Sequence, residues 1–368
     1  MFEIKTGVEL ELWVVDQTGK LCDGTGITDA HERIKPEFIG PLVEIQTEPH
    51  DNELGLRRDL QTTIQAAIRA ADDEDKQLVP LGTPLTASNA PANCERGRLF
   101  ESIYGEDVKP AKNCAGTHIH FEKENVVDQL NLLTAIDPAL ALLSSSPYYS
   151  GEKGADSSRA QAYRKKCGSE FRGYCDLWEY VDSLEEWDAR VENMYDVFKR
   201  LANERGVSAE TVDEFFTPED TVLNPVRLRQ CQPTVEWRAP DATLPSQIVE
   251  IASDVGHLVS QTGRKPIEYG SPGLRTDSIG VPEFSELRKL SRKAIDSGLE
   301  TVEVKNYLRK MGFDLSKYQP RSPQLSGPPT LSDLEARSLR LKEAHRLRED
   351  VETLTADRVV STQSIPSM

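Results

Sequence analysis

Four short segments of the sequence alternate between apolar and polar residues, and each carries two ionisable side chains an even number of positions apart, two in three segments and four in one. The segments cover residues 7–16, 41–48, 114–122 and 234–239. Their ionisable pairs are Glu9 and Glu11, Glu44 and Glu48, His118 and His120, and Glu236 and Arg238. Side chains at positions i and i+2 of a strand project from the same face of the sheet. The pattern therefore predicts four strands with one mainly apolar face and one face of carboxylates, imidazoles and a guanidinium.

Helical periodicity appears between and after these segments. Apolar residues at helical spacing predict a helix over residues 53–77, a second from about 187 to 206, and a third that begins at Pro245. A helix that starts near residue 125 should break or kink near Pro138, and a short strand is predicted over 79–83. Such helices suit the apolar face of the predicted sheet, which leaves the ionisable face open.

The character of the chain changes after about residue 265. Residues 266–282 have a loop-like composition, helices are predicted over 283–297 and 300–311, and residues 319–330, rich in proline, serine and glycine, resemble a linker. Ser332 and Glu335 are spaced to cap a last, charged helix over about 333–355, before a loose tail. We therefore expect a main domain over residues 1–265 and a helical C-terminal extension over residues 266–368.

The charge of the chain excludes several classes of partner. There are 61 acidic and 44 basic residues, and the formal net charge is −17. A chain this acidic repels phosphate backbones and anionic lipid, so we expect no nucleic-acid and no membrane partner. The longest apolar stretch, residues 132–143, contains Asp137 and Pro138 and is too short to cross a bilayer. An acid excess of this kind is also typical of proteins from a salt-loaded cytosol.

Cysteine usage predicts a reducing compartment. The six cysteines are scattered and none forms a C-x-x-C pair. The first residues lack the basic region and the small-residue cleavage site of a signal peptide. We therefore expect a cytoplasmic protein.

Carboxylates crowded on one face of a sheet need a counter-charge. Without one they repel each other and take up protons, and a divalent cation removes the conflict. Oxygen ligands favour Mg²⁺ or Mn²⁺, and Mg²⁺ held in this way usually also contacts substrate phosphates. The planar fork of Arg238, beside Glu236, suits a transferring phosphate. The alternative is a solvated face of an antiparallel sheet, which two histidines in the mostly apolar segment CAGTHIHF weigh against.

The common nucleotide-binding motifs are absent from the sequence. It contains neither G-x-x-x-x-G-K-[ST] nor G-x-G-x-x-G, and it also lacks the G-x-S-x-G and H-E-x-x-H motifs of hydrolases. Any ATP site must therefore be built on the sheet itself.

Five segments form an ordered series of motifs. They are GVELE (7–11), EIQT (44–47), GTHIH (116–120), SSPY (145–148) followed by Gly151, Gly154 and Ser158–Arg159, and PTVEWR (233–238). The series resembles the motifs of the family 2 glutamate–cysteine ligases, which are carboxylate–amine ligases. Each motif is weak alone, but five in the family's order, within residues 7–262, make a specific match.

The resemblance implies a fold and a reaction. The fold is the glutamine-synthetase-like catalytic domain, an α+β fold with a curved, mostly antiparallel sheet and helices packed on its convex face. The reaction is the ATP- and Mg²⁺-dependent formation of a γ-glutamyl amide. The γ-carboxylate of glutamate is phosphorylated, and an amine displaces the phosphate. With cysteine as the amine, the product is γ-glutamylcysteine, a compound of glutathione biosynthesis.

The resemblance also implies roles for particular residues. Glu236 and Arg238 would be catalytic, His120 and Arg238 would contact the nucleotide, and Arg159 or Arg164 would hold the substrate α-carboxylate. The metal ligands would be Glu9, Glu11, Glu44, His118 and Glu236.

The sequence departs from the family pattern at three places. Glu48 stands where the family usually has proline, and would be an extra ligand or a solvated residue. The lead-in LNPVRLRQCQ replaces a W-x-x-R segment, so that Arg227 or Arg229 would serve there. The last hundred residues do not resemble the family's ending, and would cover the site, mediate a homo-oligomer or bind a partner.

Two alternative functions stay open: the same chemistry on another amine or carboxylate, and a metal-dependent hydrolase that works without ATP.

Overall fold

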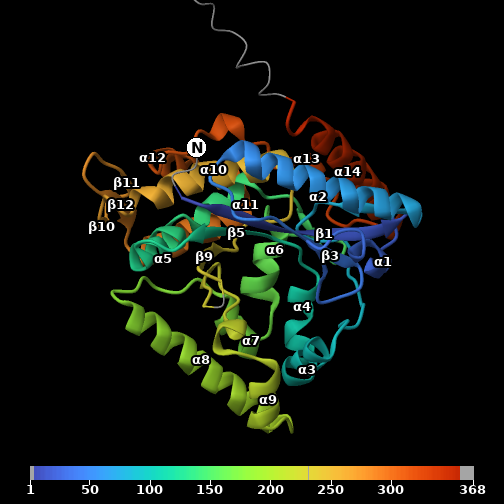
Figure 1. Ribbon diagram of the computed structural model, residues 1–368, viewed down its shortest axis with the longest axis horizontal. Coiled ribbons are helices and arrows are strands. Elements are labelled where there is room, and N and C mark those ends of the chain that lie inside the picture. Colours follow the sequence, from blue (N-terminus) through green and yellow to red (C-terminus); the bar gives the residue numbers. More distant parts are fainter. Residues whose placement is uncertain (1–3, 231, 357–368) are drawn as a thin grey trace, which may run out of the picture.

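The computed structural model describes residues 4–230 and 232–356. Figure 1 shows a sheet across the middle of the molecule, with helices above it and a lobe of further helices, among them the long α8 (Leu184–Glu204), below. The main sheet follows the order β2–β3–β1–β5–β9–β8, and β4 pairs with the far end of β1. Its strands are β1 Thr6–Asp16, β2 Ile34–Pro36, β3 Leu42–Gln46, β4 Lys76–Val79, β5 Thr117–Glu122, β8 Val226–Leu228 and β9 Thr234–Trp237. All of their pairings are antiparallel, which confirms the predicted fold class.

The register of the sheet gathers the ionisable residues. Glu9 of β1 lies opposite His118 of β5, and Glu11 lies opposite Glu44 of β3. His120 of β5 lies opposite Glu236 of β9. Residues that face each other across an antiparallel pair project from the same side of the sheet. The predicted polar face is therefore continuous across four neighbouring strands.

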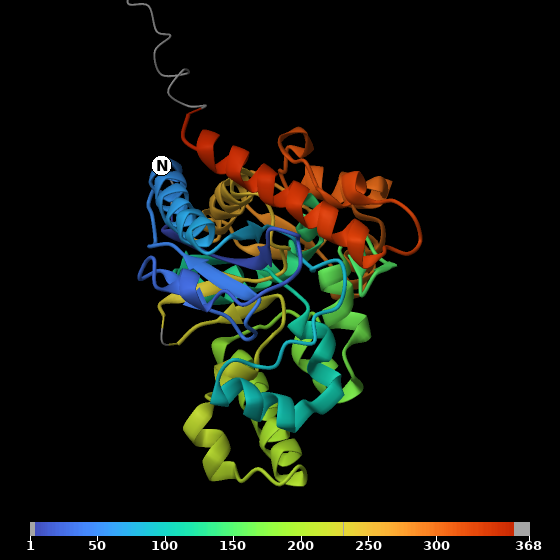
Figure 2. The same cartoon turned by 90° about the vertical axis from the view of Figure 1, so that its right-hand side faces the viewer.

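Three long helices cover the other face of the sheet, as Figures 1 and 2 show. They are α2 Glu53–Asp73, α10 Pro245–Gln261 and α14 Asp333–Thr353. Pro245 occupies the first turn of α10, and the capping box of Ser332 and Glu335 opens α14, both as predicted. Helix α2 is shorter than predicted, because the chain turns at Glu74 and residues 76–79, rather than 79–83, pair with β1.

A helical lobe lies on the polar side of the sheet (Figure 2). It contains α3 Glu95–Tyr104, α4 Lys109–Lys112, α7 Ser169–Cys175, α8 Leu184–Glu204 and α9 Ala209–Phe215. The lobe has its own aromatic core, in which the rings of Tyr104 and Phe171 are 4.8 Å apart and those of Phe198 and Phe216 are 5.1 Å apart. Edge-on ring contacts at these distances stabilise the lobe beyond the burial of its apolar area.

The break predicted near Pro138 is present. Helix α5 spans Val126–Ala135, and a 3-10 helix follows over Asp137–Leu142. The loop that leads away from it contains the short strands β6 Tyr148–Tyr149 and β7 Glu152–Lys153, and ends at α6 Ser158–Gln161.

The C-terminal region joins the same hydrophobic core as the main sheet. Val281, Ile295 and Leu347 belong to one buried cluster with the strand residues Leu10 and Val43. Helices α11 Phe284–Ser297 and α12 Val302–Lys310 agree with the predicted ones. The domain boundary at residue 265 stays a prediction, and the predicted tail, residues 359–368, lies outside the described residues. Among the described helices, none is both long and apolar enough to span a membrane.

Two C-terminal segments differ from the prediction. Residues 266–282, expected to be a loop, form a small sheet of β10 Ile267–Gly270, β11 Gly273–Leu274 and β12 Ile279–Pro282. These strands are only two to four residues long and rich in glycine, so they show no alternation. Residues 319–330, expected to be a linker, include α13 Ser322–Leu325 and pack against the body of the protein, where Ser322 is fully buried.

Candidate active site

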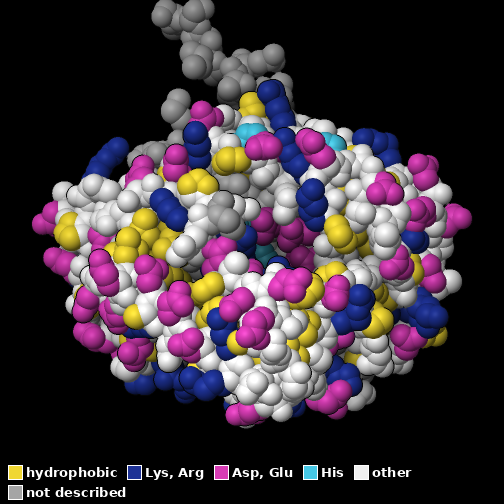
Figure 3. Space-filling model, turned by 60° about the horizontal axis from the view of Figure 1, so that its bottom comes forward, with side chains coloured by type: hydrophobic (Ala, Val, Ile, Leu, Met, Phe, Trp, Pro, Cys, Tyr) yellow, Lys and Arg dark blue, Asp and Glu magenta, His cyan; other side chains and the backbone are white. Residues whose placement is uncertain are grey.

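The two histidines of β5 lie at the centre of the polar face. His118 Nδ1 is 3.2 Å from Glu9 Oε2 and 3.5 Å from Glu236 Oε1, and His118 Nε2 is 3.6 Å from Glu11 Oε1. His120 Nε2 is 3.4 Å from Glu9 Oε2. Three carboxylates from two strands thus surround the imidazoles. Figure 3 shows acidic side chains gathered in a hollow on this side of the molecule.

These side chains are not a solvated face. Glu236 is fully buried, and Glu44, His118 and His120 are 8%, 4% and 6% exposed. Glu48 is the exception, because β3 ends at Gln46 and the alternation stops there. Its side chain is 61% exposed and pairs with Arg33 at 2.9 Å. Of the two roles considered for Glu48, an extra ligand and a solvated residue, the structure supports the second.

A further carboxylate, Glu37, was missed by the sequence analysis. Its ligand atom lies within 4.8 Å of those of Glu11 and Glu44, and two other sets meet the same limit: Glu9, Glu44 and His118, and Glu9, His120 and Glu236. Glu37 follows β2, a strand of three residues at the edge of the sheet, where no alternation can be recognised. The sequence signal that could have identified Glu37 is its position shortly before the EIQT segment.

The cluster holds more negative charge than the structure neutralises. Burial, and then repulsion by Glu9, Glu37 and Glu11, raise the pKa of Glu44 well above its usual range. Burial and Glu37 raise the pKa of Glu11 to about 8. Burial acts on Glu9 in the same direction, but contacts with His118 and His120 outweigh it and hold its pKa low. Carboxylates with raised pKa values are typical of a site that a cation completes.

The donor set fits a divalent metal ion. Nε2 of His118 and Nε2 of His120 are buried without a hydrogen-bond partner in the described chain. Burial, and then the charge of Arg238, lower the pKa of His118 to about 4, so its imidazole is neutral at pH 7. A neutral imidazole and several carboxylate oxygens are ligands that Mn²⁺ and Mg²⁺ accept.

Glu236 is held between two arginines. Arg227 Nε donates to its Oε2 at 2.8 Å, and Arg238 Nη1 donates to its Oε1 at 2.6 Å. These two cations outweigh burial and keep the pKa of Glu236 well below its usual value. Of the two lead-in arginines considered from the sequence, Arg227 reaches the cluster because β8 pairs with β9, whereas Arg229 lies 4.0 Å from Glu219.

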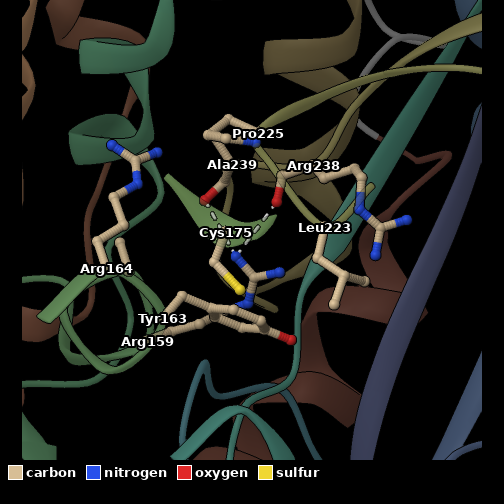
Figure 4. Close-up of a pocket in the computed structure, with 9 residues that line it drawn as sticks. Arg159, Tyr163, Arg164, Cys175, Leu223, Pro225, Arg238 and Ala239 are labelled. Carbon is tan, nitrogen blue, oxygen red and sulfur yellow. Dashed lines mark hydrogen bonds between the residues drawn. The ribbon is translucent and has the colours of Figure 1, made fainter. Parts of the chain in front are cut away.

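A pocket beside Arg238 contains the two arginines predicted to bind substrate (Figure 4). Arg159 Nη1 donates to the backbone carbonyls of Arg238 and Ala239, at 3.2 Å each, while its Nε is buried without a hydrogen-bond partner among the described residues. Arg164 points away from Arg159 in Figure 4 and donates both arms of its fork to Asp137, at 2.7 and 2.6 Å. Arg159 thus retains a buried donor without a partner among the described residues, whereas the fork of Arg164 is already bound to Asp137.

A buried aspartate, Asp241, ties this pocket to the sheet. Its carboxylate accepts from Ser145 N at 2.9 Å and from Ser157 Oγ at 3.0 Å, and the residue is 1% exposed. Burial raises its pKa to about 6, against the opposing charge of Arg159. Asp241 was not singled out from the sequence, although it stands three residues after Arg238 in PTVEWRAPD.

Comparisons with known proteins agree with this arrangement. The chain belongs to glutamate–cysteine ligase family 2, whose family model matches residues 5–267, and so to the carboxylate–amine ligases. A search of curated proteins finds no match.

The comparison with solved structures finds similar proteins at low sequence identity. The bifunctional glutathione synthetase from Pasteurella multocida is 14% identical, with a TM-score of 0.54 over 95% of this chain and 53% of that one. This chain therefore spans about half the length of that enzyme. The glutamate–cysteine ligase from Francisella tularensis in complex with AMP is 14% identical, with a TM-score of 0.47 over 100% of this chain and 96% of that one.

Proposed function

We propose that the protein is an ATP- and Mg²⁺-dependent ligase that joins the γ-carboxyl group of glutamate to the amino group of cysteine. The observation that carries the proposal is the position of Arg238. It touches the buried Glu236 on one side and lines the Arg159 pocket on the other. A phosphoryl group beside Arg238 would thus lie between a metal-binding cluster and a carboxylate-binding pocket.

The metal ion would be Mg²⁺ or Mn²⁺. Its ligands would come from Glu9, Glu11, Glu44, His118 and Glu236. When bound, the metal offsets the negative charge of the transferring phosphoryl group. His120 would contact the nucleotide, since Thr234 Oγ1 lies 3.2 Å from its Nδ1 and leaves Nε2 on the cluster side.

The three arginines near the cluster and the pocket would have different roles. Arg238, held in place by Glu236, would direct its planar fork at the γ-phosphate as charge develops there. Arg159 would bind the α-carboxylate of glutamate, because its buried Nε has no partner among the described residues. Arg164 would position the pocket wall, since Asp137 already occupies its fork.

The reaction would proceed in two displacements. An oxygen of the γ-carboxylate attacks the γ-phosphorus of ATP, and ADP leaves. The amine nitrogen then attacks the acyl carbon of the acyl phosphate, phosphate leaves, and the nitrogen loses a proton. An acyl phosphate hydrolyses in water, so the low solvent exposure of the cluster suits this chemistry.

Phosphate release from ATP tests the proposal. We expect purified protein with Mg²⁺ to release phosphate only when glutamate is present, and faster with cysteine than with other amines in a panel. The assay should include molar salt, because the charge of −17 favours unfolding at low ionic strength. A rate that follows another amine or carboxylate would keep the ligase and change its substrate. Hydrolysis of an amide or ester with metal and without ATP would replace the ligase with a hydrolase.

A further inference from the structure

Part of the C-terminal region runs along the loop that leads to Arg159. We call residues 319–331 the strap and residues 144–153 the motif loop. Backbone hydrogen bonds join them at both ends: Arg321 N and Ser322 N to Ser144 O at 2.8 and 3.0 Å, Lys153 N to Pro329 O at 2.9 Å, and Leu331 N to Gly151 O at 2.7 Å. The strap lies outside the residues matched by the family model, which end at 267.

One side chain of the motif loop links it to the middle of the strap. The Tyr148 hydroxyl donates to Pro328 O and accepts from Gly327 N, both at 2.9 Å. The tyrosine is fully buried, so its ring cannot swing out to water while the strap is in place.

The strap is itself anchored to the body of the protein. Arg321 donates to Glu343 of α14 through Nε at 3.0 Å and Nη2 at 2.7 Å. Arg321 is 4% exposed and Glu343 is fully buried. A forked ion pair in such surroundings has a single favourable geometry, so the strap is fixed relative to the helices that cover the sheet.

The motif loop passes this restraint to Arg159. Ser158, its neighbour in the chain, donates its backbone N–H to Ser146 O at 3.0 Å. On the inner side, Asp241 accepts from both Ser145 and Ser157. The motif loop is thus held between Asp241 on one side and the strap on the other, and its bond to Ser158 places the residue next to Arg159.

We propose that the strap is a positioning element for Arg159, and that the C-terminal region is therefore part of the substrate site. Without the strap, the outer restraint on the motif loop is lost, and the Arg159 guanidinium samples positions away from the carbonyl groups of Arg238 and Ala239. The identification of the glutamate α-carboxylate as the ligand of Arg159 rests on the proposed function. The hydrogen bonds between the strap and the motif loop are independent of that function.

The variant Tyr148→Phe tests this inference in the full chain. It removes both hydroxyl bonds, and Gly327 and Pro328 are exposed enough to turn to water. By the usual contribution of a hydrogen bond, we expect amide exchange in peptides covering residues 145–161 to quicken about five- to tenfold, and the KM for glutamate to rise by a similar factor. The KM for ATP should change less than about twofold, because a single positioned group is affected.

Tyr195→Phe is the matched control. Tyr195 is a buried tyrosine of the helical lobe whose hydroxyl also has two partners, Asp213 Oδ1 and Phe216 O, both at 2.8 Å. The Tyr195→Phe variant should have a lower Tm, as Tyr148→Phe does. Amide exchange in residues 145–161 and the KM for glutamate should stay as in the wild type. A second test variant, Arg321→Lys, keeps the charge beside Glu343 but loses the fork, and should act in the same direction as Tyr148→Phe.

The inference is overturned if Tyr148→Phe and Arg321→Lys lower the Tm but match Tyr195→Phe in exchange and in KM. Faster exchange with an unchanged KM also overturns it, because the strap would then hold the loop without affecting the site. If the wild-type protein releases no phosphate with glutamate, the proposed function fails, and the exchange comparison still decides whether the strap restrains the Arg159 segment.

Discussion

Glu236→Gln is expected to reduce turnover by about a thousandfold or more, because it removes a buried charge at the point where the metal cluster and Arg238 meet. The volume of the side chain hardly changes. The amide oxygen can still accept one of the two arginine hydrogen bonds, and the charged carboxylate of Glu9 remains near Arg238. We therefore expect the variant to fold, with a lower Tm than the wild type. Steady-state phosphate release and circular dichroism measure the two effects.

The same variant should also lose its thermal response to metal. A ligand that binds only the folded state raises the Tm, so Mg²⁺ or Mn²⁺ should stabilise the wild-type protein but stabilise Glu236→Gln much less. Glu48→Gln is the control, because Glu48 belongs to the same alternating pattern but is 61% exposed. Near-normal turnover in folded Glu236→Gln, or equal stabilisation of both variants by metal, would remove Glu236 from the site.

Arg159→Lys is expected to raise the KM for glutamate about 30-fold with a smaller effect on the KM for ATP. Lysine keeps the positive charge but lacks the planar fork that binds a carboxylate with two hydrogen bonds, and a charged hydrogen bond contributes about 1.5–3 kcal/mol. Substrate-saturation curves for glutamate and ATP measure the two constants.

Arg164→Lys separates the two arginines of the pocket. Its fork is bound to Asp137, which is fully buried, so this variant should lower the Tm more than it raises the KM for glutamate. The reverse result, a large rise in KM for Arg164→Lys and a small one for Arg159→Lys, would exchange their roles.

The sequence was sufficient for the parts of the sheet that alternate strictly. Strands β1, β3, β5 and β9 were predicted because polar and apolar residues alternate around their ionisable pairs. The shared face of Glu9, His118 and Glu236 follows because the opposite parity in each strand is mainly apolar. The register between neighbouring strands could not be predicted from the sequence. A shift of two residues would keep every side chain on its face, and it would separate Glu9 from His118.

The missed features depend on contacts between distant residues. Glu37 joins the cluster through a three-residue edge strand, and the helical lobe brings together two stretches of chain around Tyr104 and Phe198. The sequence left both Arg159 and Arg164 open as the substrate arginine, and the structure distinguishes them by the buried carboxylate of Asp137, which occupies Arg164. The composition of residues 319–330 indicated a linker, but the segment packs against the body of the protein. Proline and glycine also occur in segments that are fixed by neighbouring loops, so composition does not separate the two cases.

The most direct test of the ligase proposal is to follow the oxygen atoms of the carboxylate. Glutamate labelled with oxygen-18 in its γ-carboxyl group is incubated with the protein, ATP, Mg²⁺ and cysteine, and the released phosphate is analysed by mass spectrometry. If the carboxylate is phosphorylated and the amine then displaces the phosphate, each phosphate formed with an amide carries one oxygen-18 atom. Phosphate without the label, released at the rate of amide formation, would contradict the acyl-phosphate mechanism.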